Sequence, residues 1–246
     1  MPVLNQNVGR QTPMGATIVT GGTTFRTWAP TAQDVYVVTD PSATSSWSQW
    51  KPDPADRMTP LDDDTWAGFV PGIGDGDPYL FWIRGPVGGP AGFKRDPYAR
   101  ELAVQPPFPN CPCLVRPAHS FPWHDAGWLP PAFHDVIIYQ LHVGVFWGIS
   151  LSPLRYGTFL DVVGRIPYLR DLGVTAIQLL PIQEYDGDFG LGYAGLDYFS
   201  PEMAYQIEDS SVLGQRLATV NTLPPSRGSH RSRTRIWYPG LTNLDA

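Results

Sequence analysis

Three acidic side chains, Glu184, Asp186 and Asp188, lie close together directly after an apolar run. Paired carboxyl groups can serve as general acid and base, and several carboxylate oxygens together can hold calcium. Catalysis would need one carboxyl with a raised pKa in a dry site. The Asp-Gly-Asp sequence is also typical of an ordinary solvated turn. We expect a turn here, and neither a metal nor a cofactor.

His142 is a second residue with chemical potential, because it closes the apolar run Val136–His142. A nearly continuous apolar run favours a parallel strand that is buried on both faces. Polar side chains at the end of such a strand are often part of a binding site, although a lone histidine on a strand is usually structural. The elements around His142 therefore decide how it is interpreted.

Those elements follow a strand, helix, strand pattern. After the first run, apolar residues recur at spacings of three and four, which predicts an amphipathic helix; they are Phe159, Val162, Val163, Ile166, Leu169 and Leu172. Pro167 should divide this helix into two pieces, the second with proline in its first turn, and Gly173 should end it. Val174–Leu180 predicts a second buried strand. The three elements form a βαβ unit, which can begin an α/β barrel or an open sheet.

The N-terminal part has a different pattern of short β-type runs separated by turn residues. The predicted strands are 23–28, 34–38, 65–70 and 79–84. Strands of this length with regular turn signals favour an antiparallel β-sandwich. Residues 85–128 are rich in proline and glycine, and we expect a loop-rich connector there.

Composition excludes several classes of protein. The 27 prolines and 25 glycines among 246 residues exclude an all-helical bundle. A formal net charge of −6 has the wrong sign for phosphate binding, so we expect no nucleic-acid partner. No apolar stretch approaches the length of a membrane helix, which predicts no membrane association and a cytoplasmic location. The oligomeric state stays open.

Several distinctive segments occur in a fixed order between Phe25 and Glu202. They are Phe25–Pro30, Trp66–Gly72, Arg95–Ala99, Ile138–Gly144, Leu169–Ile177, Leu180–Ile182 and Leu191–Glu202. Together they resemble the alpha-amylase superfamily of glycoside hydrolases, especially members with an N-terminal carbohydrate-binding-type β-sandwich, such as glycogen branching enzymes and trehalohydrolases. The resemblance implies a multidomain β plus α/β fold, in which an immunoglobulin-like β-sandwich precedes a (β/α)₈ TIM barrel.

The same resemblance implies a retaining reaction that uses paired carboxyl groups on later barrel strands. A complete barrel takes about 250 residues, and too few residues follow Leu180 for six further strands. The sequence therefore predicts a truncated, N-terminal part of an alpha-glucan-active hydrolase or transglycosylase, without catalytic residues or turnover of its own. The alternative is a non-catalytic glucan-binding or scaffold module. Whether the chain is an enzyme, and whether a truncation, frameshift or insertion explains its end, stays open.

The resemblance also suggests substrate-binding residues for an alpha-glucan such as starch, glycogen or maltodextrin. Tyr193 matches the tyrosine that stacks under a sugar ring in the family, whereas the residues alone favour packing within its own loop. Asp197 matches an acidic position of that loop and is expected to organise it. Glu184 and His142 complete the set, because they follow the two expected strands.

Five tryptophans lie in or near the predicted sandwich. We expect Trp28 and Trp66 in its core. Trp47 and Trp50 lie in a polar, serine-rich stretch and are the better candidates for stacking against glucan.

The expected domains are a sandwich over 1–115 with a connector to about 134, the first two β/α units of a barrel over 135–209, and an irregular basic tail over 210–246.

Overall fold

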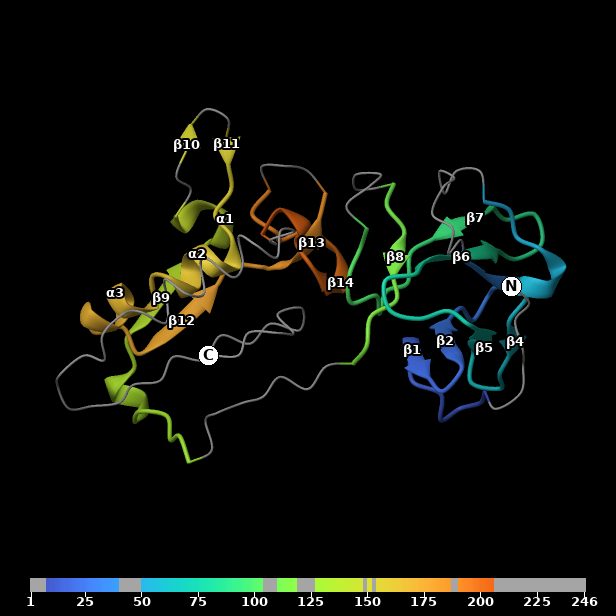
Figure 1. Cartoon of the computed structure of the whole chain (residues 1–246), viewed down its shortest axis with the longest axis horizontal. Coiled ribbons are helices and arrows are strands. Elements are labelled where there is room, and N and C mark those ends of the chain that lie inside the picture. The colour runs from blue at the N-terminus through green and yellow to red at the C-terminus, as the bar shows by residue number, and fades with distance from the viewer. Residues whose placement is uncertain are drawn as a thin grey trace. The chain divides into compact units, whose positions relative to one another are not determined.

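A computed structural model of the chain describes residues 8–39, 50–103, 110–118, 127–147, 150–151, 154–186 and 190–205. These residues form two compact units, which are drawn in Figure 1. The first, here called the sandwich unit, comprises the described residues of Met1–His119 together with Leu196–Ser200. The second unit comprises the described residues of Ser120–Gly195 and Pro201–Ala246. The expected tail, 210–246, lies outside the described residues.

The sandwich unit contains two antiparallel sheets. The first has the order β1-β2-β5-β4, and in the second β6 pairs with β3, β7 and β8. The strands are β1 (Gly15–Val19), β2 (Gly22–Trp28), β3 (Asp34–Thr39), β4 (Thr59–Pro60), β5 (Thr65–Pro71), β6 (Pro78–Arg84), β7 (Ala91–Lys94) and β8 (Cys113–Leu114). The four predicted strands are thus confirmed. Residues 85–128, which were expected to form a loop-rich connector, also contain strands β7 and β8, and both pair with β6.

Aromatic side chains fill the space between the two sheets. Phe25 of β2 and Tyr79 of β6 are fully buried and meet edge to face, with ring centroids 5.0 Å apart. Phe81 lies 5.9 Å from Tyr79 in the same arrangement. Rings that join the two sheets are consistent with a β-sandwich.

The tryptophan predictions have mixed outcomes. Trp66 is buried, as predicted. Trp50 is also buried, packed with Val38 and Leu80, so its candidacy as a binding residue was wrong. Trp47 lies outside the described residues.

The second unit contains the predicted strand, helix, strand pattern. Strands β9 (Ile138–Leu141) and β12 (Ala176–Leu179) are parallel, with Tyr139 opposite Ile177. Between them lie α2 (Phe159–Val163) and α3 (Ile166–Asp171). Pro167 is in the first turn of α3, and Gly173 follows with a φ of 90°. Both breaks occur where proline and glycine predict them, since proline suits a first turn and glycine tolerates positive φ.

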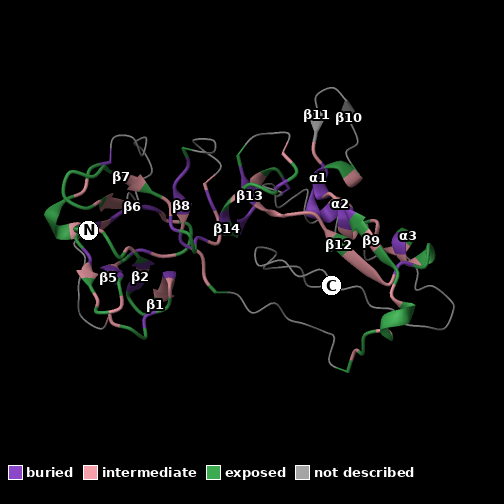
Figure 2. Ribbon diagram, turned by 180° about the vertical axis from the view of Figure 1, so that it is seen from behind, coloured by how far each residue is buried: buried purple, intermediate pink, exposed green. Residues whose placement is uncertain are grey.

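Apart from β14, the remaining elements of the described residues are short. They are α1 (Val143–Phe146), β10 (Ser150–Leu151), β11 (Leu154–Arg155), β13 (Gln183–Tyr185), β14 (Gly195–Pro201) and the 3₁₀ turns η2 (Pro54–Asp56), η3 (Phe133–Asp135) and η4 (Met203–Tyr205). Figure 2 shows buried residues on α1, α2 and β13, while β9 and β12 are largely intermediate or exposed. The expectation that these two strands are buried on both faces was wrong. Within the described part of the chain, none of the helices has the length and apolarity needed to span a bilayer.

Candidate functional site

Trp28 ends strand β2 with its indole turned to solvent. Side chains alternate between the two faces of a strand. Phe25 and Thr27 are buried in the unit, and Trp28 is 64% exposed. The expectation that Trp28 belongs to the core was wrong, because it lies on the face opposite Phe25. An exposed indole on a paired strand offers a flat, rigid stacking surface.

A network of polar groups surrounds Arg26, which shares the outer face of β2 with Trp28. The Arg26 Nε donates to Thr65 Oγ1 at 3.0 Å, and its Nη1 donates to the carbonyl oxygens of Arg10 and Thr12 at 2.6 and 2.8 Å. Arg26 also pairs with Asp63. Thr65 is the register partner of Trp28, so this network fixes the strand pair beneath the indole.

Asp197 is brought into the sandwich unit by strand β14. Its carboxylate accepts a hydrogen bond from Arg95 Nε at 2.9 Å and is almost fully buried. Burial raises the pKa of Asp197, and the guanidinium of Arg95 opposes that shift. A second hydrogen bond joins the same two segments: Ser200 Oγ donates to the carbonyl of Ala99 at 2.7 Å. Two segments about a hundred residues apart in sequence therefore hold each other.

Asp96 lies next to this pair in the interior of the sandwich unit. It accepts hydrogen bonds from the Tyr79 hydroxyl at 2.7 Å and from the backbone N–H of Tyr98 at 2.9 Å. Burial raises the pKa of Asp96 to about 6, because these donors and Arg100 only partly replace water, and the charge of Asp197 adds to the rise.

The raised pKa of Asp96 predicts a pH-dependent contribution to stability. Between its unfolded value of 3.8 and about 6, the folded protein retains a proton that the unfolded chain has lost, so stability from this group falls as pH rises. Compared with Asp96→Asn, the wild type should lose about 2 kcal/mol of unfolding free energy between pH 4.5 and 7. Urea unfolding of both proteins at each pH measures the difference. If the difference in unfolding free energy between the two proteins stayed constant from pH 4.5 to 7, the raised pKa of the buried Asp96 carboxyl would be contradicted.

Polar side chains also gather after the parallel strands of the second unit. His142 follows β9, and its Nε2 lies 3.2 Å from the Tyr205 hydroxyl. That hydroxyl lies 3.1 Å from the hydroxyl of Tyr185, which follows β12 on strand β13. Burial and the Tyr185 hydroxyl raise the pKa of Tyr205, so this phenol stays neutral. Glu184 is buried and accepts the backbone N–H of Met203 at 2.9 Å. The Tyr205 hydroxyl thus lies within hydrogen-bond distance of both His142 and Tyr185, whereas Glu184 binds the backbone.

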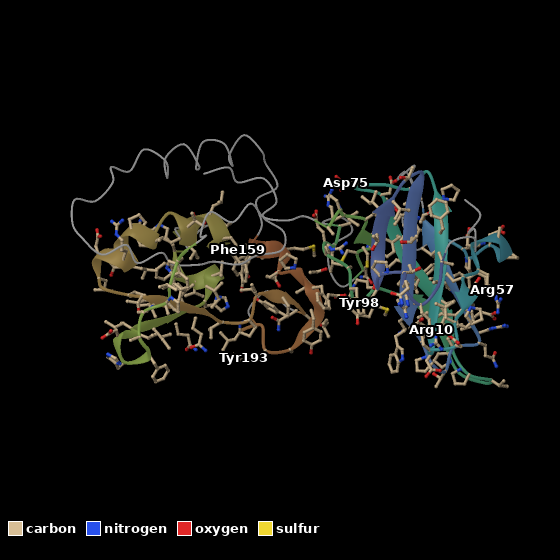
Figure 3. The ribbon with its side chains drawn as sticks, turned by 90° about the horizontal axis from the view of Figure 1, so that it is seen from below. Arg10, Arg57, Asp75, Tyr98, Phe159 and Tyr193 are labelled. Carbon is tan, nitrogen blue, oxygen red and sulfur yellow. The ribbon has the colours of Figure 1, made fainter. Side chains whose placement is uncertain are left out.

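Tyr193 has the surroundings of a surface residue. It belongs to the second unit, is labelled in Figure 3, and is 72% exposed. An open phenol ring is available for stacking, whereas a ring packed in its own loop would be covered.

The four predicted site residues are divided between the two units. Asp197 belongs to the sandwich unit, whereas His142, Glu184 and Tyr193 belong to the second unit. Asp186 is exposed, Asp188 lies outside the described residues, and the described residues contain no cluster of three side chains suited to a metal. Trp28 and Arg95 were not among the predicted site residues: strand alternation was the available signal for Trp28, and no local signal exists for Arg95.

Comparisons of sequence identify the relatives of the chain. Residues 13–99 match carbohydrate-binding module 48, the isoamylase N-terminal domain. The chain is 33% identical over 204 residues to a 1,4-alpha-glucan branching enzyme of Burkholderia cenocepacia (strain HI2424), an alignment that covers 78% of this chain and 27% of that protein. It is 34% identical over 197 residues to the malto-oligosyltrehalose trehalohydrolase of Deinococcus radiodurans, covering 79% of this chain and 28% of that protein.

The chain also matches part of several solved enzyme structures. Pullulanase from Paenibacillus barengoltzii matches with a TM-score of 0.61 and 25% identity, over 78% of this chain and 32% of that chain. Pullulanase from Anoxybacillus sp. LM18-11 matches with a TM-score of 0.61 and 25% identity, over 80% and 29%. The chain spans less than a third of the length of these curated relatives and solved structures. The predicted resemblance is confirmed: the chain carries a carbohydrate-binding module 48 domain and is similar to the N-terminal part of alpha-amylase-superfamily enzymes.

Proposed function

We propose that this chain binds alpha-glucan through its sandwich unit, with Trp28 as the stacking surface. The observation that carries the proposal is the exposed indole of Trp28 on a paired strand, within the segment that matches carbohydrate-binding module 48. The apolar C–H face of a glucose ring suits the face of an indole. The polar network around Arg26 holds the strands beneath that indole in place. We also propose that the two sheets of this unit are arranged as in an immunoglobulin-like sandwich.

We further propose that the second unit represents the first two β/α units of a TIM barrel, with boundaries near 135 and 209. The parallel β9 and β12, joined through α2 and α3, support this interpretation. The matched structures are pullulanases, which fits a role in alpha-glucan hydrolysis or transglycosylation for the protein to which such units belong. The proposed location is the cytoplasm.

The predicted site residues receive different proposed roles. We assign Tyr193 a sugar-stacking role because its ring is open. Glu184 and His142 bind protein groups around Tyr205 and Met203, which suits positioning of the strand ends more than direct contact with sugar. Asp197 is bound to Arg95 and suits the predicted role of an organiser.

Affinity electrophoresis in gels that contain glycogen tests the proposed binding. The wild type should be retarded, and Trp28→Ala should lose at least about 5-fold in affinity, since stacking on one aromatic ring is worth about 1–3 kcal/mol. Phe133→Ala is the matched control, because Phe133 is an exposed aromatic of the second unit. Equal retardation of wild type and Trp28→Ala would exclude the indole as the binding surface.

Turnover is tested separately, by release of reducing sugar from starch and maltodextrin. The expected result is none, because the two described carboxyl groups considered as catalytic candidates do not share one dry site: Glu184 accepts the backbone N–H of Met203, and Asp186 is exposed. Release that disappears in Glu184→Gln would overturn this proposal and assign catalysis to the second unit.

A further inference from the structure

Strand β14 brings a short segment of chain onto the sandwich unit, where buried contacts hold it. The segment is Leu196–Ser200, here called the docked segment. Asp197 is 4% exposed and accepts a hydrogen bond from Arg95 Nε at 2.9 Å. Ser200 is 1% exposed, and its Oγ donates to the carbonyl oxygen of Ala99 at 2.7 Å. Both contacts are made to the same stretch of the sandwich unit, from Arg95 to Ala99, so the state of that stretch decides how firmly the docked segment is held.

Asp96 lies within that stretch, and the sandwich unit encloses its side chain completely. The carboxyl group accepts hydrogen bonds from the Tyr79 hydroxyl and from the backbone N–H of Tyr98, both of which are neutral donors. Tyr98, labelled in Figure 3, also stacks its ring on Phe199 of the docked segment, with centroids 5.1 Å apart. A Cβ atom added at Gly15 of β1 would lie 3.4 Å from Asp96 Oδ2, so β1 leaves little room for water beside the carboxyl group. A negative charge on Asp96 would therefore be poorly hydrated.

Ionisable groups from several elements face Asp96. They are Tyr79 of β6, Cys113 of β8, Asp197 of the docked segment, and the neighbouring Arg95 and Arg100. Burial raises the pKa of the Tyr79 hydroxyl and of the Cys113 thiol well above their ordinary values, so both groups stay neutral. Burial also raises the pKa of Asp96 to about 6; Arg100 opposes this rise, and the charge of Asp197 adds to it. The charge beside the docked segment therefore changes at mildly acidic pH.

We propose that the docked segment is a pH-sensitive latch, which holds to the sandwich unit while Asp96 is protonated and holds less firmly once Asp96 is ionised. When the segment leaves, the charge of Asp197 leaves with it and water reaches the Asp96 carboxyl group. The pKa of Asp96 is therefore higher in the docked state than in the released state. Docking is strongest below the pKa of the released state and weakens as pH rises through about 6. None of the latch residues belongs to the polar network beneath Trp28, so the latch is independent of the proposed glucan binding.

Thiol labelling of the full chain measures how often the docked segment leaves. Ser200→Cys places a buried thiol in the docked segment, and the two native cysteines, Cys111 and Cys113, are buried in the sandwich unit. The reagent 4,4′-dithiodipyridine reacts with a thiol once it is exposed, and division by the labelling rate of the urea-unfolded chain at the same pH gives the opening equilibrium constant. If release lowers the pKa of Asp96 by about one unit, the opening constant at Ser200→Cys should rise about 5-fold from pH 5 to pH 7.5. The native thiols, distinguished by mass spectrometry, should be labelled more slowly at both pH values, because their exposure requires opening of the sandwich unit itself.

Three carboxyl substitutions in the Ser200→Cys background test the role of Asp96. Asp96→Asn should remove the rise in the opening constant, because asparagine carries no charge at either pH. Asp197→Asn should reduce the rise, since the like charge is absent, and it keeps the test possible if Asp96→Asn does not fold. Asp56→Asn is the matched control: burial also raises the pKa of this carboxyl group, which lies in η2, and the rise should stay at its full size.

Three results would each overturn the latch. The first is an opening constant at Ser200→Cys that is the same at pH 5 and pH 7.5. The second is labelling of Ser200→Cys no faster than that of Cys113, which would mean that the docked segment is exposed only when the sandwich unit opens. The third is an undiminished rise in Asp96→Asn, or in Asp197→Asn where the first variant does not fold, which would assign the pH dependence to another group.

Discussion

Replacing Arg95 by leucine is expected to lower the unfolding free energy of the sandwich unit by about 3 kcal/mol. The substitution leaves the Asp197 carboxylate buried without the cation that binds it at 2.9 Å. Removing one partner of a buried ion pair is costly because the other charge stays desolvated. The value is at the low end of the usual range, since the Arg95 side chain keeps partial access to water.

The reverse change, Asp197→Asn, should cost only about 1 kcal/mol. Asparagine keeps an oxygen that can accept from Arg95 Nε, and the guanidinium can still reach water. Hydrogen exchange of the β2 and β6 amides measures the stability of the sandwich unit without contributions from the second unit. The double variant Arg95→Leu with Asp197→Asn should be more stable than Arg95→Leu alone. If the two single changes lowered the unfolding free energy equally, the cost of Arg95→Leu would not come from the unpaired buried charge of Asp197.

Local sequence patterns were sufficient for four sandwich strands and for the strand, helix, strand unit, but not for strands such as β1 and β14. Turn residues bracket β2, β3, β5 and β6, and each of these strands begins and ends within about one residue of its prediction. Pro167 and Gly173 mark the break and the end of the helical segment. Backbone constraints at proline and glycine act within a few residues, so they can be identified without knowledge of the fold.

The candidate sites were less predictable, because they depend on which face is buried and on distant contacts. Phe25 and Trp28 are both large and aromatic, and only their positions three residues apart on a strand place them on opposite faces. The pairing of Arg95 with Asp197 joins residues separated by 102 positions. Both segments are visible in the sequence, but nothing local indicates that they meet.

The second unit is expected to open far more readily than the sandwich unit. Its parallel sheet has two strands, β9 and β12, in the described part of the chain. One face packs on the α2 and α3 core through residues such as Leu141. The other face is open: Ile138 is 61% exposed, and the side chains of Gln140 and Gln178 bind each other at an exposed position. Parallel strands are usually covered on both faces, so this sheet lacks much of the burial that normally stabilises it.

Native-state hydrogen exchange should therefore show the β9 and β12 amides exchanging at least 100-fold faster than those of β2 and β6, a difference of roughly 3 kcal/mol in opening free energy. Limited proteolysis with mass detection should cut within 136–202 while leaving 23–84 intact. Leu169→Ala, which removes a buried side chain of the second unit, should speed exchange in β9 and β12 and leave β2 and β6 unchanged. If β9 and β12 are instead as protected as β2 and β6 in a monomer, the incomplete-barrel interpretation fails. The second unit would then be a self-contained domain whose open face is stable in water.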